Sequence, residues 1–278
     1  MKLVSFSAND GLIRPGALLE DGNLVLDFSG AYKDTLDIIS AGLNSPPVGV
    51  TYRSFPLAEV RIHAPLANPP RILCIGANYS EHAKETGHAV SEVPVVFLKM
   101  TTAIIGPGDP IVLPVNSAEP DYEAELAFVI GHGGFRIAAD DWHRHVYGYT
   151  IVNDVSARDI QRATSQWSLA KSFPTFCPMG PAIVTADEVC DPHSLEIRLT
   201  IDGETLQHAS TNQFVFQIPR LIEYISSITP LLPGDIVSTG TPAGVGIGRT
   251  PKRWLRPGES VTISIEHLGT LTNPVIAE

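Results

Sequence analysis

The residue pattern most able to do chemistry is an acidic cluster. Four carboxylates, Glu119, Asp121, Glu123 and Glu125, fall within seven residues that contain no lysine or arginine. If Glu123 and Glu125 lie on a strand, its period of two puts them on one face, and the apolar run 126–130 carries that face inward. Like charges in a low dielectric repel by roughly several kcal/mol unless a cation such as Mg²⁺, Mn²⁺ or Ca²⁺ compensates. The alternative is an exposed acidic turn before a strand.

A third metal-ligand candidate is Asp154. It directly follows an apolar segment, 146–153, that is typical of a strand, and helix-favouring residues come next. A strand-to-helix junction holds a carboxylate at an edge where ligands often bind. The alternative role is that of an N-cap aspartate for the helix that follows.

A second constellation contains His82 and Glu85. On a helix the two residues share a face, because they are three apart. A carboxylate beside an imidazole fixes its tautomer and raises its basicity, which suits activation of water. The alternative is a weak ion pair on an exposed helix.

Two lysines and one glycine-rich loop complete the candidates. Lys99 and Lys171 stand among apolar residues, so each either meets a substrate carboxylate or the acidic cluster, or extends along the surface to water. The loop 238–248 could present backbone N–H groups to an anion. It contains no GxxxxGK(S/T) and does not complete GxGxxG, because position 249 is Arg249, so a nucleotide-binding fold is not supported.

The elements that must position these residues are mostly short strands. We predict helices over 34–43, 80–87, 156–166 and 217–227. Apolar runs and turn residues predict strands over 71–76, 93–98, 126–131, 146–153, 195–201, 204–208, 235–239 and 260–266. Asp21-Gly22 predicts a hairpin turn. The proline-rich segment 64–70 predicts a boundary between a small N-terminal domain, 1–68, and a larger one, 69–278.

Composition excludes several classes of protein. Lys and Arg number 19 against 30 Asp and Glu, a net charge of −11 that disfavours binding to nucleic acid. No run of eighteen apolar residues predicts a membrane span, and the first residues lack the apolar core of a signal peptide. Three cysteines, Cys74, Cys177 and Cys190, form no disulfide framework and are expected to be buried thiols. We therefore expect a cytoplasmic protein.

Taken together, the motifs resemble the fumarylacetoacetate hydrolase family from about Arg71 to the C-terminus. The likeness is carried by six segments in order: 75–79 with His82 and Glu85, 97–99, 121–126, 153–159, 171–173, and 232–236 with 239–242. The resemblance implies a mixed, β-rich fold: a β-roll with few short helices, preceded by a small α+β domain. It also implies a homodimer.

The resemblance further implies a role for each matching residue. Glu123, Glu125 and Asp154 would bind one divalent cation per chain, Mg²⁺ or Mn²⁺. His82 and Glu85 would form a water-activating pair on a short helix that closes over the site. The other implied residues are catalytic Lys171 and substrate-binding Tyr79, Lys99, Arg158, Gln161 and Thr241. One departure is Pro174, where the family usually has an aspartate, and it affects how Lys171 is held.

The implied activity is hydrolysis of a C–C bond in a small 1,3-diketo acid of the acylpyruvate type, through a metal-stabilised enolate, with the pair His82 and Glu85 activating water. The same enolate also arises when oxaloacetate is decarboxylated or a 2-hydroxy-dienoate is isomerised. The metal ligands do not distinguish these reactions. A metal-stabilised binding protein without catalytic activity is the alternative of a different class.

Overall fold

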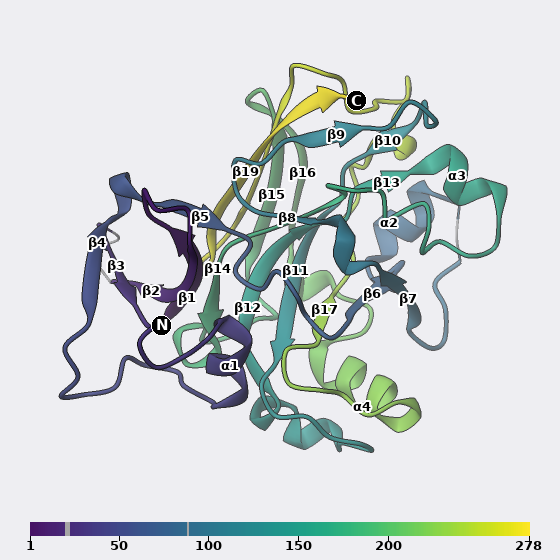
Figure 1. Cartoon of the computed structure of the whole chain (residues 1–278). Coiled ribbons are helices and arrows are strands. Elements are labelled where there is room, and N and C mark those ends of the chain that lie inside the picture. Colours follow the sequence, from purple (N-terminus) through teal and green to yellow (C-terminus); the bar gives the residue numbers. More distant parts are fainter. Residues whose placement is uncertain (20–22, 88) are drawn as a thin grey trace.

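The largest element of the fold is a long mixed sheet. The computed structural model describes residues 1–19, 23–87 and 89–278. Within them the sheet has the order β4-β3-β2-β1-β14-β12-β11-β17-β6-β7, with β5 on β1 and β8 on β14 (Figure 1). Its strands are β1 (Lys2–Ser7), β2 (Ile13–Leu18), β3 (Leu24–Asp27), β4 (Arg53–Pro56), β5 (Arg61–His63), β6 (Ile72–Gly76), β7 (Val95–Lys99), β8 (Ile104–Ile105), β11 (Ala124–Ile130), β12 (Val146–Asn153), β14 (Cys177–Thr185) and β17 (Ile236–Ser238).

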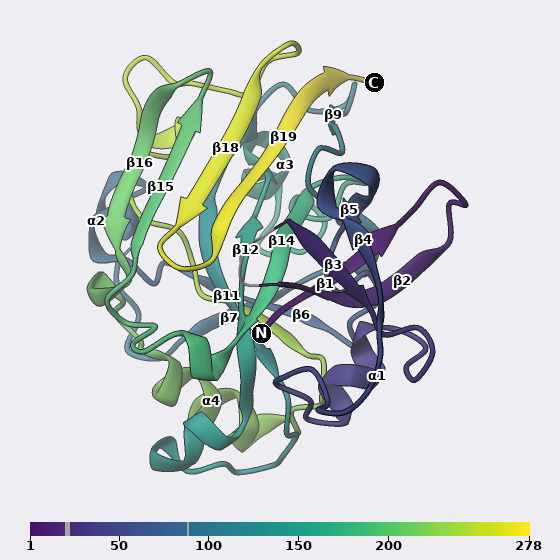
Figure 2. The same cartoon turned by 90° about the vertical axis from the view of Figure 1, so that its left-hand side faces the viewer.

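A second sheet covers one face of the first (Figure 2). It has the order β16-β15-β18-β19-β9. The short strands β10 and β13 form a separate two-stranded sheet. The strands are β9 (Ile111–Leu113), β10 (Pro120–Asp121), β13 (Ser156–Ala157), β15 (Glu196–Ile201), β16 (Glu204–Ser210), β18 (Ser260–Ile265) and β19 (Gly269–Ala277). The predicted β-rich class is confirmed.

Helices are short and few in the described part of the chain. The α-helices are α1 (Thr35–Ser40), α2 (Ser80–Glu85), α3 (Arg158–Ala163) and α4 (Ile218–Ile228), and the short 3₁₀-helices are η1 (Leu57–Glu59), η2 (Thr101–Ala103), η3 (Ala139–Arg144), η4 (Ala186–Glu188), η5 (Thr211–Gln213) and η6 (Gly246–Gly248). Helix α4 buries Ile218, Leu221, Ile222 and Ile225, the spacing of one helical face. All four predicted helices exist, but α3 is shorter than the predicted segment 156–166, since residues 156–157 form β13.

Strand β11 lies at the centre of the protein and is buried over its whole length. Leu126 and Phe128 face the core shared with the second sheet and α4, whereas Ala127 and Val129 face a second core built with the N-terminal strands. A strand covered on both faces reads as a continuous apolar run, which is what 126–130 shows. It therefore gives the carboxylates at its beginning a rigid support.

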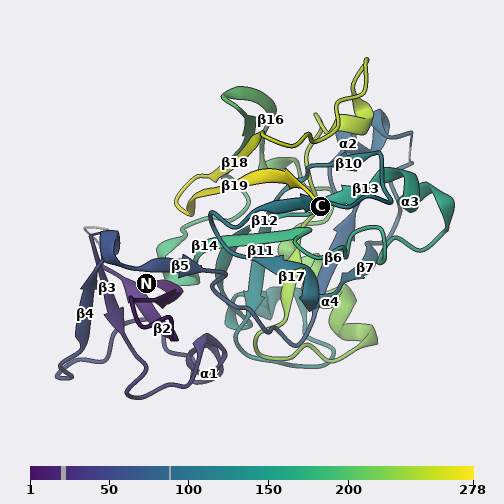
Figure 3. The same cartoon turned by 45° about the horizontal axis from the view of Figure 1, so that its top comes forward.

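The N-terminal segment gathers on one side of the molecule, opposite α2 and α3 (Figure 3). Strands β2 and β3 pair antiparallel, with Leu18 opposite Val25, as a hairpin requires. The predicted turn at Asp21-Gly22 lies outside the described residues. Strand β1 joins the long sheet, where Leu3 pairs with Ile183 of β14. The division of the chain at residue 68 stays a prediction.

Two remaining predictions concern membranes and cysteines. No helix in residues 1–19, 23–87 and 89–278 is long and apolar enough to cross a membrane. Cys74 and Cys177 are buried free thiols, as predicted. Cys190 is exposed, so the prediction of a buried thiol is wrong there: it follows the turn η4 and precedes Asp191-Pro192, outside both sheets.

Candidate metal and active site

Three carboxylates meet at one end of the central strands of the long sheet, where β11 begins and β12 ends. The ligand oxygens of Glu123, Glu125 and Asp154 lie within 4.8 Å of one another, and all three residues are buried. Glu125 is on β11, as predicted, but Glu123 lies between β10 and β11 rather than on a strand. The backbone holds it there: its N–H donates to Asn153 Oδ1 at 3.0 Å, and its carbonyl accepts from Asp154 N at 2.9 Å.

Asp154 is held by two lysines. Its Oδ1 accepts from Lys99 Nζ at 2.7 Å and its Oδ2 from Lys171 Nζ at 2.6 Å. Helix α3 starts four residues later, with Ala157 at the N-cap position, so Asp154 does not cap it. Of the two roles considered for Asp154, the structure therefore supports the one within the acidic cluster.

Glu123, like Asp154, is paired with two cations. Its Oε1 accepts from Arg158 Nη2 at 2.5 Å and its Oε2 from Lys171 Nζ at 2.7 Å. Burial alone would raise the pKa of Glu123, but the charges of Arg158 and Lys171 outweigh it and hold that pKa well below its usual range. Glu123 is therefore an anion in the folded protein.

Glu125 has a different environment. Its Oε2 accepts from Ser238 Oγ at 2.5 Å and from Gly240 N at 3.0 Å, and no lysine, arginine or histidine of the described chain forms an ion pair with it. Burial, together with the charges of Asp154 and Glu123, raises the pKa of Glu125 to about 8. The part of the site around Glu125 therefore lacks a positive charge that would compensate its carboxylate.

This donor set fits a hard divalent cation. When all are ionised, the four buried carboxylates of Asp121, Glu123, Glu125 and Asp154 face three buried cations, Lys99, Arg158 and Lys171, so ionisation of Glu125 leaves one negative charge in excess. Mg²⁺ and Mn²⁺ favour carboxylate oxygens and would supply the missing charge beside Glu125. The three residues predicted as ligands are the three that the structure brings together.

The second constellation forms on α2. His82 Nδ1 lies 3.0 Å from Glu85 Oε1, and His82 is buried. Glu85 is itself held, since both of its oxygens accept from Gly244 N, at 3.1 and 3.0 Å. With Nδ1 bonded to a carboxylate, the tautomer assigned to the neutral ring carries its proton on Nδ1 and leaves Nε2 as the base.

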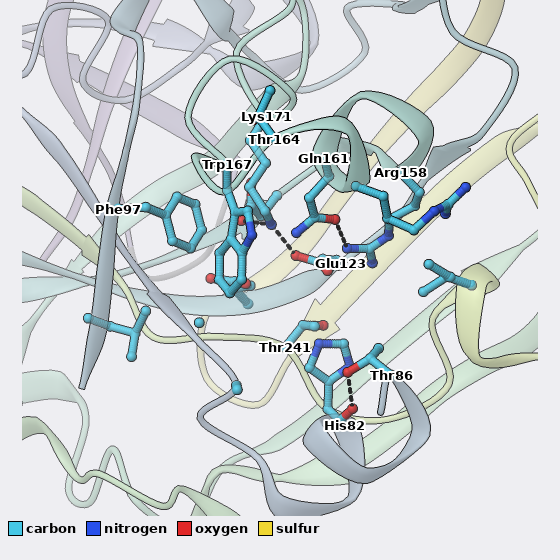
Figure 4. Close-up of a pocket in the computed structure, with 17 residues that line it drawn as sticks. His82, Thr86, Phe97, Glu123, Arg158, Gln161, Thr164, Trp167, Lys171 and Thr241 are labelled. Atoms are coloured by element: carbon cyan, nitrogen blue, oxygen red, sulfur yellow. Dashed lines mark hydrogen bonds and ion pairs between the residues drawn. The ribbon is translucent and has the colours of Figure 1, made fainter. Parts of the chain in front are cut away.

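The three carboxylates and His82 line one cavity of about 300 Å³, and Glu85 supports His82 from behind the lining. In Figure 4, His82 and Thr86 approach from one side, Arg158 and Gln161 from the other, and Glu123 lies between them. The aromatic wall is made by Phe97 and Trp167, whose rings meet edge to face at 5.5 Å between centroids. The described lining residues are Ile75, Gly76, Ala77, His82, Thr86, Phe97, Glu123, Glu125, Asp154, Arg158, Gln161, Arg162, Thr164, Trp167, Lys171, Thr241 and Ile247.

Three of the five residues predicted to bind substrate, Arg158, Gln161 and Thr241, line this cavity, and Tyr79 and Lys99 do not. Lys171, predicted as catalytic, is also in the lining. Tyr79 is buried with its ring edge-on against Phe214, 5.2 Å between centroids. Lys99 uses its three donors on Asp154 Oδ1, on Val155 O at 3.2 Å and on Lys171 O.

The departure at Pro174 also lies away from the cavity. Pro174 is exposed and borders a separate groove with Val112 and Phe173. Lys171, which it was expected to affect, is held by Glu123 and Asp154. The structure therefore gives Pro174 no contact with the reacting groups, and substrate roles for the lining residues stay predictions.

The glycine-rich loop 238–248 does present N–H groups to anions, but these anions belong to the protein. Gly240 N donates to Glu125, Gly244 N to Glu85, and Gly246 N and Ile247 N to Asp121. Sequence reasoning identified the loop and its donors but not their partners, because the three carboxylates come from distant segments. The arrangement ties one candidate metal ligand, Glu125, and the imidazole pair to a single loop.

Gly240→Ala is expected to weaken metal binding about tenfold and to destabilise the fold by roughly 1–3 kcal/mol. Gly240 has φ +93°, and an added Cβ would lie 2.8 Å from Ile75 O and 2.9 Å from Asn78 Cβ. The matched control is Gly203→Ala, which has φ +86° and no atom within 4 Å of the added Cβ. Thermal unfolding and Mn²⁺ titration compare the two. Equal effects of the two variants on Mn²⁺ affinity would show that displacement of the Gly240 N–H from Glu125 does not matter.

The protein thus combines a β-rich fold with one cavity, in which a buried carboxylate triad that could bind a divalent metal lies beside the imidazole of His82. Residues 71–276 match the family described as fumarylacetoacetate (FAA) hydrolase C-terminal, and the chain belongs to that family.

Relatives within the family carry different activities in their names. The mitochondrial oxaloacetate tautomerase of Xenopus laevis is 42% identical over 289 residues, 99% of this chain and 90% of the relative. A solved fumarylacetoacetate hydrolase from Exiguobacterium antarcticum aligns with TM-score 0.90 at 35% identity and covers 100% of both chains. A 2-hydroxyhepta-2,4-diene-1,7-dioate isomerase from Mycobacterium marinum aligns with TM-score 0.82 at 38% identity, covering 100% of this chain and 99% of its own.

Proposed function

We propose that this chain is a divalent-metal-dependent tautomerase that interconverts the enol and keto forms of a short 2-oxo acid, with oxaloacetate as the first substrate to test. The observation that carries the proposal is that the carboxylate triad and His82, whose Nδ1 is bonded to Glu85, line one cavity of about 300 Å³. The identity with the Xenopus laevis oxaloacetate tautomerase over nearly the whole chain supports this choice among the activities in the family.

In this proposal His82 moves the proton. Conversion of an enol to its ketone removes one proton from oxygen and adds one at the neighbouring carbon, so a single base that accepts and returns a proton is sufficient. Glu85 holds the imidazole through Nδ1, at 3.0 Å, and leaves Nε2 directed to the reacting atoms. Gly244 N keeps Glu85 in that position.

The other residues hold the acid and exclude water. Arg158 and Lys171 are buried cations in the lining, each partly neutralised by Glu123, and Gln161 and Thr241 add polar groups. A bound Mg²⁺ or Mn²⁺ would supply a Lewis acid for the negative charge that develops on the 2-oxo group. Phe97 and Trp167 form an apolar wall that suits the flat shape of an enol.

The second candidate is hydrolysis of an acylpyruvate, favoured by the same pair, because an imidazole backed by a carboxylate also activates water. Decarboxylation of oxaloacetate and isomerisation of a 2-hydroxy-dienoate need the same charge stabilisation and no nucleophile. A metal-binding protein without turnover is the remaining alternative.

The test follows the loss of the oxaloacetate enol by its ultraviolet absorbance, with Mg²⁺ or Mn²⁺ and with chelator. We expect a metal-dependent acceleration over the spontaneous rate and no pyruvate. Pyruvate from oxaloacetate would instead identify a decarboxylase, and pyruvate with an equal amount of carboxylic acid from an acylpyruvate would identify a hydrolase. Metal and ligand binding without turnover on any of these acids would contradict the proposal.

Two further parts of the proposal concern the protein in the cell. A homodimer and a cytoplasmic location both stay predictions. Light scattering of the purified protein measures the first, and cell fractionation measures the second. A monomer at working concentration would contradict the predicted assembly.

A further inference from the structure

Asp121 is the one carboxylate of the acidic cluster that is fully buried but neither a candidate metal ligand nor part of the cavity lining. Its two oxygens accept four hydrogen bonds. Oδ1 accepts from Gly246 N at 2.7 Å and from Tyr122 N at 2.8 Å, and Oδ2 accepts from Arg158 Nε at 2.8 Å and Ile247 N at 2.9 Å. Such a saturated buried carboxylate fixes the position of every group that donates to it.

One of these four bonds fixes the orientation of Arg158. Its Nε donates to Asp121, its Nη2 to Glu123 at 2.5 Å and its Nη1 to Gln161 Oε1 at 3.0 Å. The guanidinium is planar, so the bond at Nε also sets the direction of the two terminal nitrogens. Asp121 therefore determines how Arg158 faces Glu123.

The bonds from Gly246 N and Ile247 N fix the glycine-rich loop. An added Cβ at Gly246 would lie 2.7 Å from Asp121 Oδ1 and 1.8 Å from Arg253 O, so the loop approaches Asp121 as closely as only glycine permits. Two residues before this anchor, Gly244 N donates to Glu85. The position of Glu85 thus depends on where Asp121 holds the loop.

The next residue holds the same loop from its other side. Tyr122 is buried, and its hydroxyl donates to Gly244 O at 3.1 Å. The carbonyl of Gly244 is fixed by Tyr122 while its N–H is directed at Glu85. Three consecutive residues, Asp121, Tyr122 and Glu123, therefore serve the arginine, the loop and the candidate metal ligand set.

We propose that Asp121, assisted by Tyr122, is a positioning residue that aligns Arg158 with the metal site and, through Gly244, holds Glu85 and so fixes the tautomer of His82. Neither residue contacts the substrate. The inference rests on the proposed function only where turnover is measured. The tautomer of His82 and the affinity for Mn²⁺ are measured without substrate, so a failure of this inference is distinguishable from a failure of the proposed function.

The test is Asp121→Asn, which keeps the shape of the side chain but turns one acceptor into a donor that faces N–H groups. Nitrogen-15 NMR of labelled histidine, assigned by comparison with His82→Ala, reports the His82 tautomer. We expect the wild-type protein to hold the Nδ1–H form and Asp121→Asn to mix both forms. Mn²⁺ affinity should fall about tenfold or more, and turnover should fall about a hundredfold because the base is misplaced.

A milder variant covers the case in which Asp121→Asn does not fold. Tyr122→Phe removes only the hydroxyl bonded to Gly244, whose carbonyl keeps a bond from Arg249 Nε at 3.1 Å. We expect the same tautomer mixing to a smaller extent and a loss of turnover of about fivefold.

The matched control is Asp235→Asn. Asp235 is also fully buried and accepts from an arginine Nε, that of Arg71 at 3.1 Å, and from a backbone N–H, that of Leu232 at 2.8 Å. It lies outside the cavity lining, so its variant should lower the melting temperature but leave the His82 tautomer and the Mn²⁺ affinity as in wild type. An unchanged tautomer in the folded Asp121→Asn and Tyr122→Phe variants, or an equal change in Asp235→Asn, would overturn the proposal.

Discussion

Glu125→Gln is expected to weaken the binding of Mg²⁺ or Mn²⁺ by on the order of 10³-fold and to abolish turnover with it. Glu125 is the ligand candidate whose charge no ion pair in the described chain compensates, and its pKa is raised to about 8 because it is buried near Asp154 and Glu123. A neutral amide keeps the shape and removes the charge that a cation would need. Isothermal titration with each metal measures the loss.

The matched control for this variant is Glu85→Gln. It removes a carboxylate that belongs to the imidazole pair and not to the triad, so turnover should fall while metal affinity stays within about twofold. In chelator, Glu125→Gln should be at least as stable as wild type, because a buried amide does not require charge compensation. Added metal should then raise the melting temperature of wild type alone. Tight metal binding by Glu125→Gln would contradict its assignment as a ligand.

His82→Ala is expected to lose about 10²- to 10⁴-fold in turnover while it retains the metal affinity of wild type. The imidazole is held by Glu85 at 3.0 Å and lines the cavity, but it is not part of the carboxylate triad. The loss should therefore fall on the proton transfer and leave the metal site intact. Initial rates at saturating metal, with metal titration on the same preparation, measure the two effects separately.

His143→Ala is the control for His82→Ala, since His143 is exposed on η3 and should tolerate the change. Retained turnover in His82→Ala would exclude His82 as the group that carries the proton, for tautomerisation and for hydrolysis alike. Loss of metal binding together with turnover would show that the helix α2 supports the metal site and not only the base.

The parts of the site that could be predicted from sequence are those with a local signal. The carboxylate at the start of an apolar run identified Glu125 on β11, and the end of the strand at residue 153 identified Asp154, whereas the prediction that Glu123 lies on the same strand is wrong. The spacing of His82 and Glu85 predicted their contact on α2. In each case the partners are a few residues apart, or the end of one regular element fixes the position.

The parts that could not be predicted depend on contacts between distant segments. Strand β14 is nine residues long and pairs with β12, yet its two prolines and one glycine hide the pattern of a strand. The cavity wall formed by Phe97 and Trp167 joins residues seventy positions apart. Glu123 reaches the triad from outside β11, because Asn153 and Asp154 bind its backbone and no periodicity expresses that.

The attachment of three carboxylates to the loop 238–248 has a consequence for how such enzymes diversify. A substitution in that loop would disturb metal, base and arginine at once, so it is open to few changes. The far wall of the cavity, with Gln161, Arg162 and Trp167, comes from α3 and the chain after it. The loop that holds the carboxylates and this wall therefore come from separate segments of the chain, and a laboratory search for new substrates would begin at residues 161–167.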